Sequence, residues 1–227
     1  MSLWGQAAKI LVPLPNGDIQ HFFLKTVSVG QLGRTMVRSE FESLKAIRAV
    51  SPSLVPLPHA WGRYDCDLEM TDIWEGSCSV LYQKQLAHMI KLDQQRNGVL
   101  PEFQHACKLV VEKVIPRLLE PLQSSGRTIK PCLVHGDLWD ENTATDVQTG
   151  QSFIFDAASF YAHNEYELGD WRANRHLLND RIYVDQYKRD FPPSEPRSEW
   201  DDRNLLYSFR FDLGTLILIP GCPQRDM

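Results

Sequence analysis

The stretch Leu133-Val134-His135-Gly136-Asp137-Leu138-Trp139-Asp140-Glu141-Asn142 decides how this chain is interpreted. It places Asp137 five residues before Asn142, directly after a short apolar run. A second carboxylate, Asp156, ends the apolar run Phe153-Ile154-Phe155. Phosphoryl transfer from ATP needs a carboxylate that positions and deprotonates a hydroxyl group, together with oxygen ligands for Mg²⁺. The order of these residues therefore predicts a phosphotransferase site.

Each piece of this pattern also has an ordinary structural explanation. His-Gly-Asp is a run of three common residues, and an aspartate at the end of a strand usually forms a turn. The ordered combination, with its short spacing and the apolar strand before Asp156, favours the catalytic interpretation.

At these residues the sequence resembles the fructosamine kinase (ketosamine 3-kinase) family, within the wider group of aminoglycoside and choline kinase-like phosphotransferases. The wider group shares only the H-G-D…N…D skeleton. The family resemblance rests on Leu133–Trp139, Ile154–Tyr161 and His163–Leu168, and the later segment Asp201–Tyr207 is similar to family members from fungi. The resemblance to the family covers nearly the whole chain, though not continuously.

The resemblance implies a role for five residues. Asp137 matches the catalytic base, and Asn142 and Asp156 match the Mg²⁺ ligands. Lys25 matches the lysine that holds the phosphates of ATP. Glu40 matches the glutamate that pairs with this lysine and fixes its position.

Lys25 and Glu40 depend on the resemblance more than the other three. Taken alone, Lys25 is a solvated lysine at a strand end, and Glu40 belongs to a charged helix face. Glu42 is the rival of Glu40, and it lies on a different face of the same predicted helix because it is two positions away.

A second group of candidates has weaker support. Trp139 is interpreted either as a wall of the sugar pocket or as a buried structural residue. His163 and Glu165 are candidates for substrate binding, with structural roles as the alternative. For Glu167 we favour a structural role, through capping or an ion pair with Arg172 or another basic residue.

The pattern of apolar residues predicts an α+β chain. A strand pair, Ala7–Leu14 and Ile19–Val27, is joined by the Asn16-Gly17 turn. Four helices are predicted from apolar spacing, at Thr35–Val50, Ser79–Gln95, Phe103–Leu122 and Trp200–Leu218. The resemblance implies a two-lobed protein-kinase-like fold, with residues 1–72 as a truncated, β-rich N-lobe and residues 73–227 as a mainly helical C-lobe.

Two parts of the family pattern are missing. The first strand and the nucleotide-covering loop are curtailed, since Gly5 alone is no phosphate-binding glycine loop. The hinge between the lobes and the first C-lobe helix are replaced by the short acidic stretch Asp65–Ile73. We therefore expect a weakened adenine site and an exposed apolar stripe on Phe103–Leu122.

Composition narrows the partners and the compartment. A net charge of -5 argues against binding nucleic acid by bulk electrostatics. Five scattered cysteines without a C-x-x-C pair indicate a reduced protein without a zinc site. No secretory signal and no membrane-spanning run is visible, so we expect a cytoplasmic protein.

The resemblance implies that ATP and Mg²⁺ serve to phosphorylate the 3-hydroxyl of a ketosamine, on a glycated protein or a small molecule. Similarity to fungal members favours ribulosamine over fructosamine. The alternatives are a kinase of another small alcohol, of the aminoglycoside or choline type, and a truncated, non-catalytic remnant that acts as a binding module. The oligomeric state is left open.

Overall fold

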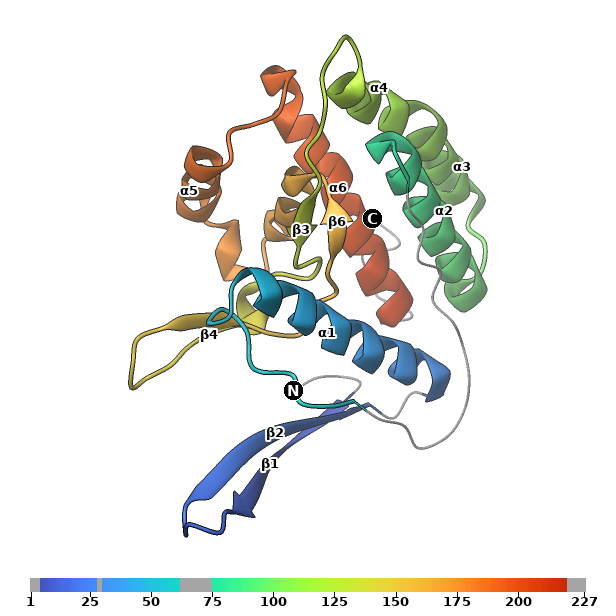
Figure 1. Ribbon diagram of the computed structural model, residues 1–227. Helices are drawn as coiled ribbons and strands as arrows, with labels where there is room; N and C mark the ends of the chain where they lie inside the picture. The colour runs from blue at the N-terminus through green and yellow to red at the C-terminus, as the bar shows by residue number, and fades with distance from the viewer. Residues whose placement is uncertain (1–4, 28–29, 62–74, 220–227) are drawn as a thin grey trace.

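The computed structural model describes residues 5–27, 30–61 and 75–219. A long β-hairpin is followed by a mainly helical part that contains two small two-stranded sheets. In Figure 1, helix α1 lies between the hairpin and the helical part. The predicted α+β class is confirmed.

The hairpin follows its sequence signals closely. Strand β1 (Gly5–Pro13) pairs antiparallel with strand β2 (Ile19–Val27) along their whole length. Gly17 has a φ of 89°, in the left-handed region that the tight turn requires and that glycine adopts without strain. The Asn16 side chain binds Asp18 within the turn. The predicted strand–turn–strand unit is therefore confirmed.

Helix α1 (Gly30–Val50) begins five residues earlier than predicted. Ser43 and Ile47 are four residues apart, lie on the same face and are both buried. Ile47 packs in a small apolar cluster that includes Ala157. The Ser43 hydroxyl accepts a hydrogen bond of 2.7 Å from the Ser159 N–H. These contacts attach α1 to the segment that follows Asp156.

The main apolar core lies among the helices of the mainly helical part. They are α2 (Cys78–Asn97), α3 (Pro101–Leu109), α4 (Ile115–Leu119) and α6 (Trp200–Leu218), with the π-helical turn η1 (Val110–Val114) and the 3₁₀ turn η2 (Glu120–Gln123). Each predicted helix of this part is present, and α6 has the predicted ends.

The predicted exposure of an apolar stripe on Phe103–Leu122 is wrong. Ile115, Leu118 and Leu119 are at most 3% exposed, and α2 and α6 pack against α4. The apolar face of this stretch therefore has a cover within the described part of the chain.

The π-helical turn has a local cause in Pro116. A proline inside a helix has no N–H to donate, and its ring clashes with the carbonyl four residues earlier. The Ile115 N–H bonds to the Val110 carbonyl, five residues back. This wider turn makes room for the proline ring and lets the helix continue.

Two short strand pairs frame the predicted catalytic stretch. Strand β3 (Cys132–Val134) pairs with β6 (Phe160–Ala162), and β4 (Thr143–Thr145) pairs with β5 (Ser152–Ile154). The pairing brings the segment after Val134 next to the segment that follows Asp156. Five further elements were not predicted: η3 (Asp140–Asn142), η4 (Asn164–Arg172), η5 (Leu177–Asn179), α5 (Arg181–Asp190) and η6 (Arg197–Glu199).

The prediction about the hinge concerns residues 65–73, which lie outside the described residues, as does the proposed boundary at residues 72 and 73. Within the described ranges, no helix is both long enough and apolar enough to cross a membrane.

Candidate active site

The turn after β3 depends on a glycine. Gly136 has a φ of +81°, and a Cβ atom there would lie 2.4 Å from the carbonyl oxygen of Ala158. The Ala158 N–H in turn donates to the His135 carbonyl at 2.9 Å. Gly136 therefore lets two backbone segments approach closely, and this approach sets the position of Asp137.

We expect Gly136→Ala to lower the free energy of unfolding by roughly 2–4 kcal/mol, because the substitution adds left-handed strain to a backbone clash. Gly150→Ala is the matched control. Gly150 has a φ of +71° but open space around its Cβ position, so only about 1 kcal/mol should be lost. Urea unfolding of both variants measures the difference. Equal losses would show that the contact with Ala158 is unimportant.

Glu167 holds the same turn from the other side. Its carboxylate accepts the backbone N–H groups of His135 and Gly136, the latter at 3.0 Å. Burial raises the pKa of Glu167 to about 7, although the two N–H donors oppose the rise. The structure favours a structural role for Glu167. The predicted ion pair with Arg172 is not formed: Glu167 binds two backbone N–H groups, and Arg172 pairs with Asp201.

Asp137 and Asn142 contact each other directly. The Asn142 amide nitrogen donates to the Asp137 carbonyl at 2.7 Å and to its carboxylate Oδ2 at 3.0 Å. Burial raises the pKa of Asp137 to about 6, and the nearby carboxylate of Asp170 adds to the rise. A higher pKa makes the Asp137 carboxylate a stronger proton acceptor than an ordinary aspartate.

His135 joins the two halves of the stretch. Its Nδ1 accepts the Asp137 N–H at 3.3 Å, so its Nε2 carries the proton and donates to the Phe155 carbonyl at 2.9 Å. Burial lowers the pKa of His135, which keeps the ring neutral. No separate role was predicted for this histidine, and the structure shows that it ties Asp137 to Phe155, the residue before Asp156.

Lys25, Glu40 and Asp156 meet although they are far apart in the sequence. The Lys25 Nζ atom lies 2.9 Å from Glu40 Oε2 and 2.7 Å from Asp156 Oδ1. Burial lowers the pKa of Lys25, but its bonds to Asp156 and Glu40 outweigh this, so the pKa is raised and the charge is kept. Asp156 has a φ of 59°, uncommon outside glycine, which turns the chain sharply after β5.

The rival glutamate lies elsewhere. Glu42 pairs with Lys45 at 3.0 Å, and both side chains are more than half exposed. The geometry thus selects Glu40 as the partner of Lys25, in line with the choice made from the resemblance.

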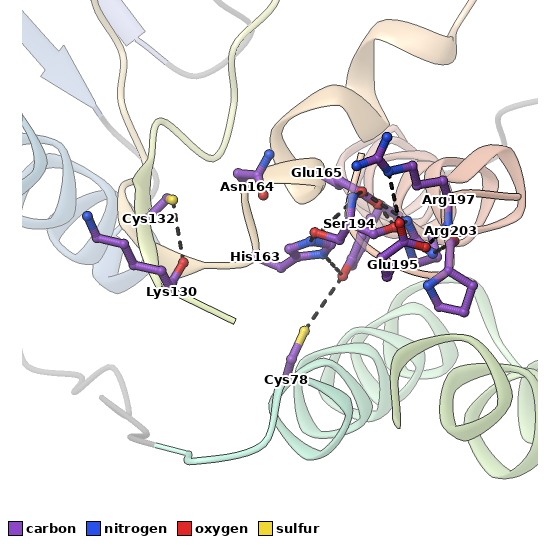
Figure 2. A network of polar contacts seen from close by, with 12 residues as sticks. Cys78, Lys130, Cys132, His163, Asn164, Glu165, Ser194, Glu195, Arg197 and Arg203 are labelled. Atoms are coloured by element: carbon purple, nitrogen blue, oxygen red, sulfur yellow. Dashed lines mark hydrogen bonds and ion pairs between the residues drawn. The ribbon is translucent and has the colours of Figure 1, made fainter. Parts of the chain in front are cut away.

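Glu165 is a buried partner of Arg203 (Figure 2). The Arg203 guanidinium donates to both carboxylate oxygens at 2.7 and 2.9 Å, and both side chains are at most 1% exposed. The same carboxylate accepts the Ser194 N–H at 2.8 Å. Arg203 also donates to the carbonyls of Ser194 and Pro196. This arrangement favours the structural alternative for Glu165.

His163 belongs to the same network. Its ring nitrogens lie 3.0 Å from the Tyr207 hydroxyl and 2.9 Å from the Ser194 hydroxyl. Burial lowers the pKa of His163 to about 4, so the ring is neutral near pH 7. Since both nitrogens have partners within the protein, a structural role is favoured here too.

Trp139 is half-buried beside the catalytic turn. Its ring meets His176 edge-on, with ring centroids 5.0 Å apart. Of the three weaker candidates, Trp139 alone lies within two residues of Asp137. Its role as a wall of a sugar pocket stays a prediction.

Asn142 and Asp156 fit a Mg²⁺ site by their donor chemistry. The amide nitrogen of Asn142 is used for Asp137, which leaves its oxygen to bind a cation, and Asp156 adds a carboxylate. The Phe155 N–H donates to the Asn142 carbonyl at 3.1 Å, which ties the two residues together. In the described residues, no three His, Cys, Asp or Glu side chains are arranged to hold a metal. A site with few protein ligands suits Mg²⁺ that is also bound by phosphates.

Comparison with known proteins decides the family. The family model described as fructosamine kinase matches residues 69–219. The chain belongs to the fructosamine kinase family. The predicted resemblance is therefore confirmed.

Curated relatives of this fructosamine kinase family member carry related names. Protein-ribulosamine 3-kinase, chloroplastic, from Oryza sativa subsp. japonica is 28% identical over 199 residues, covering 69% of this chain and 57% of that protein. A probable ketoamine kinase from Synechocystis is 30% identical over 173 residues, covering 75% of this chain and 48% of that protein. Ketosamine-3-kinase from Mus musculus is 50% identical over 54 residues, or 24% of this chain and 15% of that protein. The chain thus spans about half the length of the first two.

A solved structure supports the fold. The crystal structure of a putative fructosamine-3-kinase from Haemophilus somnus 129PT matches with a TM-score of 0.58 at 14% identity, covering 93% of this chain and 84% of that one. The kinase-like α+β fold predicted for this family member is confirmed.

Proposed function

We propose that this chain catalyses the ATP-dependent phosphorylation of the 3-hydroxyl of a ketosamine. The meeting of Lys25, Glu40 and Asp156 carries the proposal. Glu40 fixes the Lys25 ammonium group on one side, and the Asp156 carboxylate lies 2.7 Å from it on the other. This arrangement suits a lysine that binds phosphates beside a metal site. The names of the curated relatives support a ketosamine as the substrate class.

The reaction follows from the positions of these groups. The Asp137 carboxylate accepts the proton of the substrate hydroxyl, and the freed oxygen attacks the γ-phosphorus of ATP. A new O–P bond forms while the bond from that phosphorus to the β-phosphate oxygen breaks. The products are the 3-phosphorylated ketosamine, ADP and a proton.

The negative charge on the phosphates of ATP must be balanced by cations during the transfer. Lys25 holds the phosphates, and Glu40 keeps Lys25 in place. Asn142 and Asp156 would hold Mg²⁺, which would supply positive charge to the transferred group. Because His135 ties Asp137 to Phe155, the residue before Asp156, the base and the metal ligands stay in a fixed relation.

For the substrate we propose a ribulosamine on a glycated protein lysine, since the rice relative bears that name. Phosphorylation would destabilise the adduct, so that it leaves and the amine is restored. We propose a cytoplasmic setting from the cysteine usage, whereas the name of the rice relative places that protein in the chloroplast.

Thermal unfolding with and without Mg-ATP tests the nucleotide site. A ligand bound only by the native state raises its stability by about 2.7 kcal/mol at a hundredfold excess over its Kd. We expect a Mg²⁺-dependent rise that is lost in Asp156→Ala and Asp156→Asn, each compared with its own ligand-free transition. Glu40→Gln should reduce the rise, and the matched variant Glu42→Gln should leave it unchanged.

Transfer is then followed by ³¹P NMR with a ribulosamine of free lysine, a 3-deoxy analogue and a glycated protein. A sugar phosphate formed from the first and absent with the second would support the proposal. Mg-ATP binding without this product, but with transfer to choline or an aminoglycoside, would favour the other small-alcohol kinases. Absence of any Mg-ATP effect would favour a non-catalytic remnant.

A further inference from the structure

The outer part of the catalytic loop is held by one neighbouring segment, residues 171–177. The Trp171 indole N–H donates to the Leu138 carbonyl at 2.7 Å. The His176 ring meets the Trp139 ring edge-on at 5.0 Å. The Leu177 N–H donates to Asp140 Oδ1 at 2.8 Å. Three consecutive loop residues that follow Asp137 are therefore each fixed by this segment.

His176 differs from Trp171 and Leu177 because its ring nitrogens form no hydrogen bond in the described residues. The side chain is buried, and neither ring nitrogen has a hydrogen-bond partner within the described residues. Yet both face carboxylates: Nδ1 lies 3.6 Å from Asp140 Oδ1, and Nε2 lies 3.4 Å from Asp170 Oδ1. Asp170 is itself buried, on η4.

The neutral and the doubly protonated imidazole differ in the contacts that they can make with Asp140 and Asp170. A neutral ring has one N–H and one lone pair, so either tautomer turns a lone pair toward a carboxylate oxygen. The doubly protonated ring presents an N–H to both carboxylates and forms two charge-assisted contacts. The doubly protonated ring therefore turns an N–H toward the buried Asp170 and toward the partly buried Asp140 at the same time.

The other charges around the ring are few. Arg175 Nη2 lies 4.0 Å from Asp170 Oδ1 and competes weakly for that carboxylate. Asp212, on α6, lies within electrostatic range of both His176 and Asp170. Together with Asp140 and Asp170, these groups place three carboxylates and one guanidinium around the ring within the described part of the chain.

We propose that His176 is a positioning residue which, in its protonated form, bridges Asp140 and Asp170 and thereby fixes the Trp139 ring beside the substrate hydroxyl. The part that concerns substrate rests on the proposed function. Loss of the proton removes one of the two contacts and releases Trp139, so the effect falls on sugar binding. Lys25, Glu40 and Asp156 lie outside this network, so ATP binding is unaffected.

The bridge is tested without any activity by NMR. The indole N–H resonance of Trp139, assigned with Trp139→Phe, is followed across pH together with the His176 ring protons. We expect the two to titrate with one midpoint in the unmodified chain. In His176→Gln the indole should lose that titration, whereas His105→Gln, which replaces an exposed histidine on α3, should keep it. A Trp139 resonance that ignores the titration of His176 would overturn the bridge.

Kinetics test the link to substrate. His176→Gln should raise the KM for the ribulosamine about tenfold, as expected for one lost charge-assisted hydrogen bond, with kcat and the KM for ATP within about twofold. The KM of the unmodified chain should rise with pH toward that of the variant, which should be flat. A fall in kcat of about tenfold with an unchanged KM for the ribulosamine would overturn the positioning role. If the unmodified chain phosphorylates no ketosamine, the proposed function fails, while the NMR result still decides the bridge.

Discussion

Asp137→Asn is expected to slow phosphoryl transfer by about 10²- to 10⁴-fold, the usual contribution of a general base. The variant keeps the shape of the side chain and an oxygen for Asn142, which donates to Asp137 Oδ2 at 3.0 Å. It loses only the ability to accept the proton of the hydroxyl. Because burial raises the pKa of Asp137 to about 6, a neutral amide in its place should leave the free energy of unfolding equal or higher.

The measurement combines turnover with thermal unfolding. Asp190→Asn serves as the control, since it removes an exposed carboxylate at the end of α5 and should change neither quantity. A fall in the rate together with a lower melting temperature would point to a folding defect and would count against the assignment of Asp137 as the base. So would a rate within about tenfold of the unmodified chain.

Arg203→Leu is expected to lower the free energy of unfolding by about 3–5 kcal/mol, because it leaves the buried Glu165 carboxylate without its counter-charge. The two side chains are at most 1% exposed, so water cannot replace the lost partner. The carbonyls of Ser194 and Pro196 lose their donor as well. For a domain of this size the melting temperature should fall by roughly 6–20 °C. Urea denaturation gives the free energy directly.

Arg172→Leu provides a matched control on the same two elements, η4 and α6. Arg172 binds Asp201, whose side chain is 73% exposed, and donates one hydrogen bond to Asn204, so its removal should cost no more than about 2 kcal/mol. Glu165→Leu combined with Arg203→Leu should recover part of the loss, since no buried charge then remains unpaired. Equal effects of Arg172→Leu and Arg203→Leu would show that burial of the pair does not determine its contribution.

Much of the fold was readable because its signals are local. The hairpin follows from the Asn16-Gly17 turn between two apolar runs, and α6 follows from helical spacing between clear ends. Helix α5 (Arg181–Asp190) was missed because it is short and most of its residues are polar and exposed; its apolar face is small, with Val184 and Tyr187 packed against a minor cluster. The stripe on Phe103–Leu122 was expected to be exposed because the sequence does not show that α2 and α6 cover it.

The site divides in the same way. The order of Asp137, Asn142 and Asp156 is a local pattern, so the sequence by itself determined the family and the candidates for base and metal ligands. The choice between Glu40 and Glu42 could be made from the resemblance, but only the tertiary structure shows Glu40 at 2.9 Å from Lys25.

The weaker candidates were decided by tertiary contacts alone. Glu165 and His163 follow soon after Asp156 in sequence, yet their polar atoms bind Arg203, Ser194 and Tyr207 in the folded chain. His176 carried no sequence signal, since a lone histidine has none until its neighbours are known. The sequence by itself determined the family of this protein and the residues on which its proposed chemistry depends. The tertiary structure decided which charged side chains are left for that chemistry, because burial and pairing depend on residues brought together from distant parts of the chain.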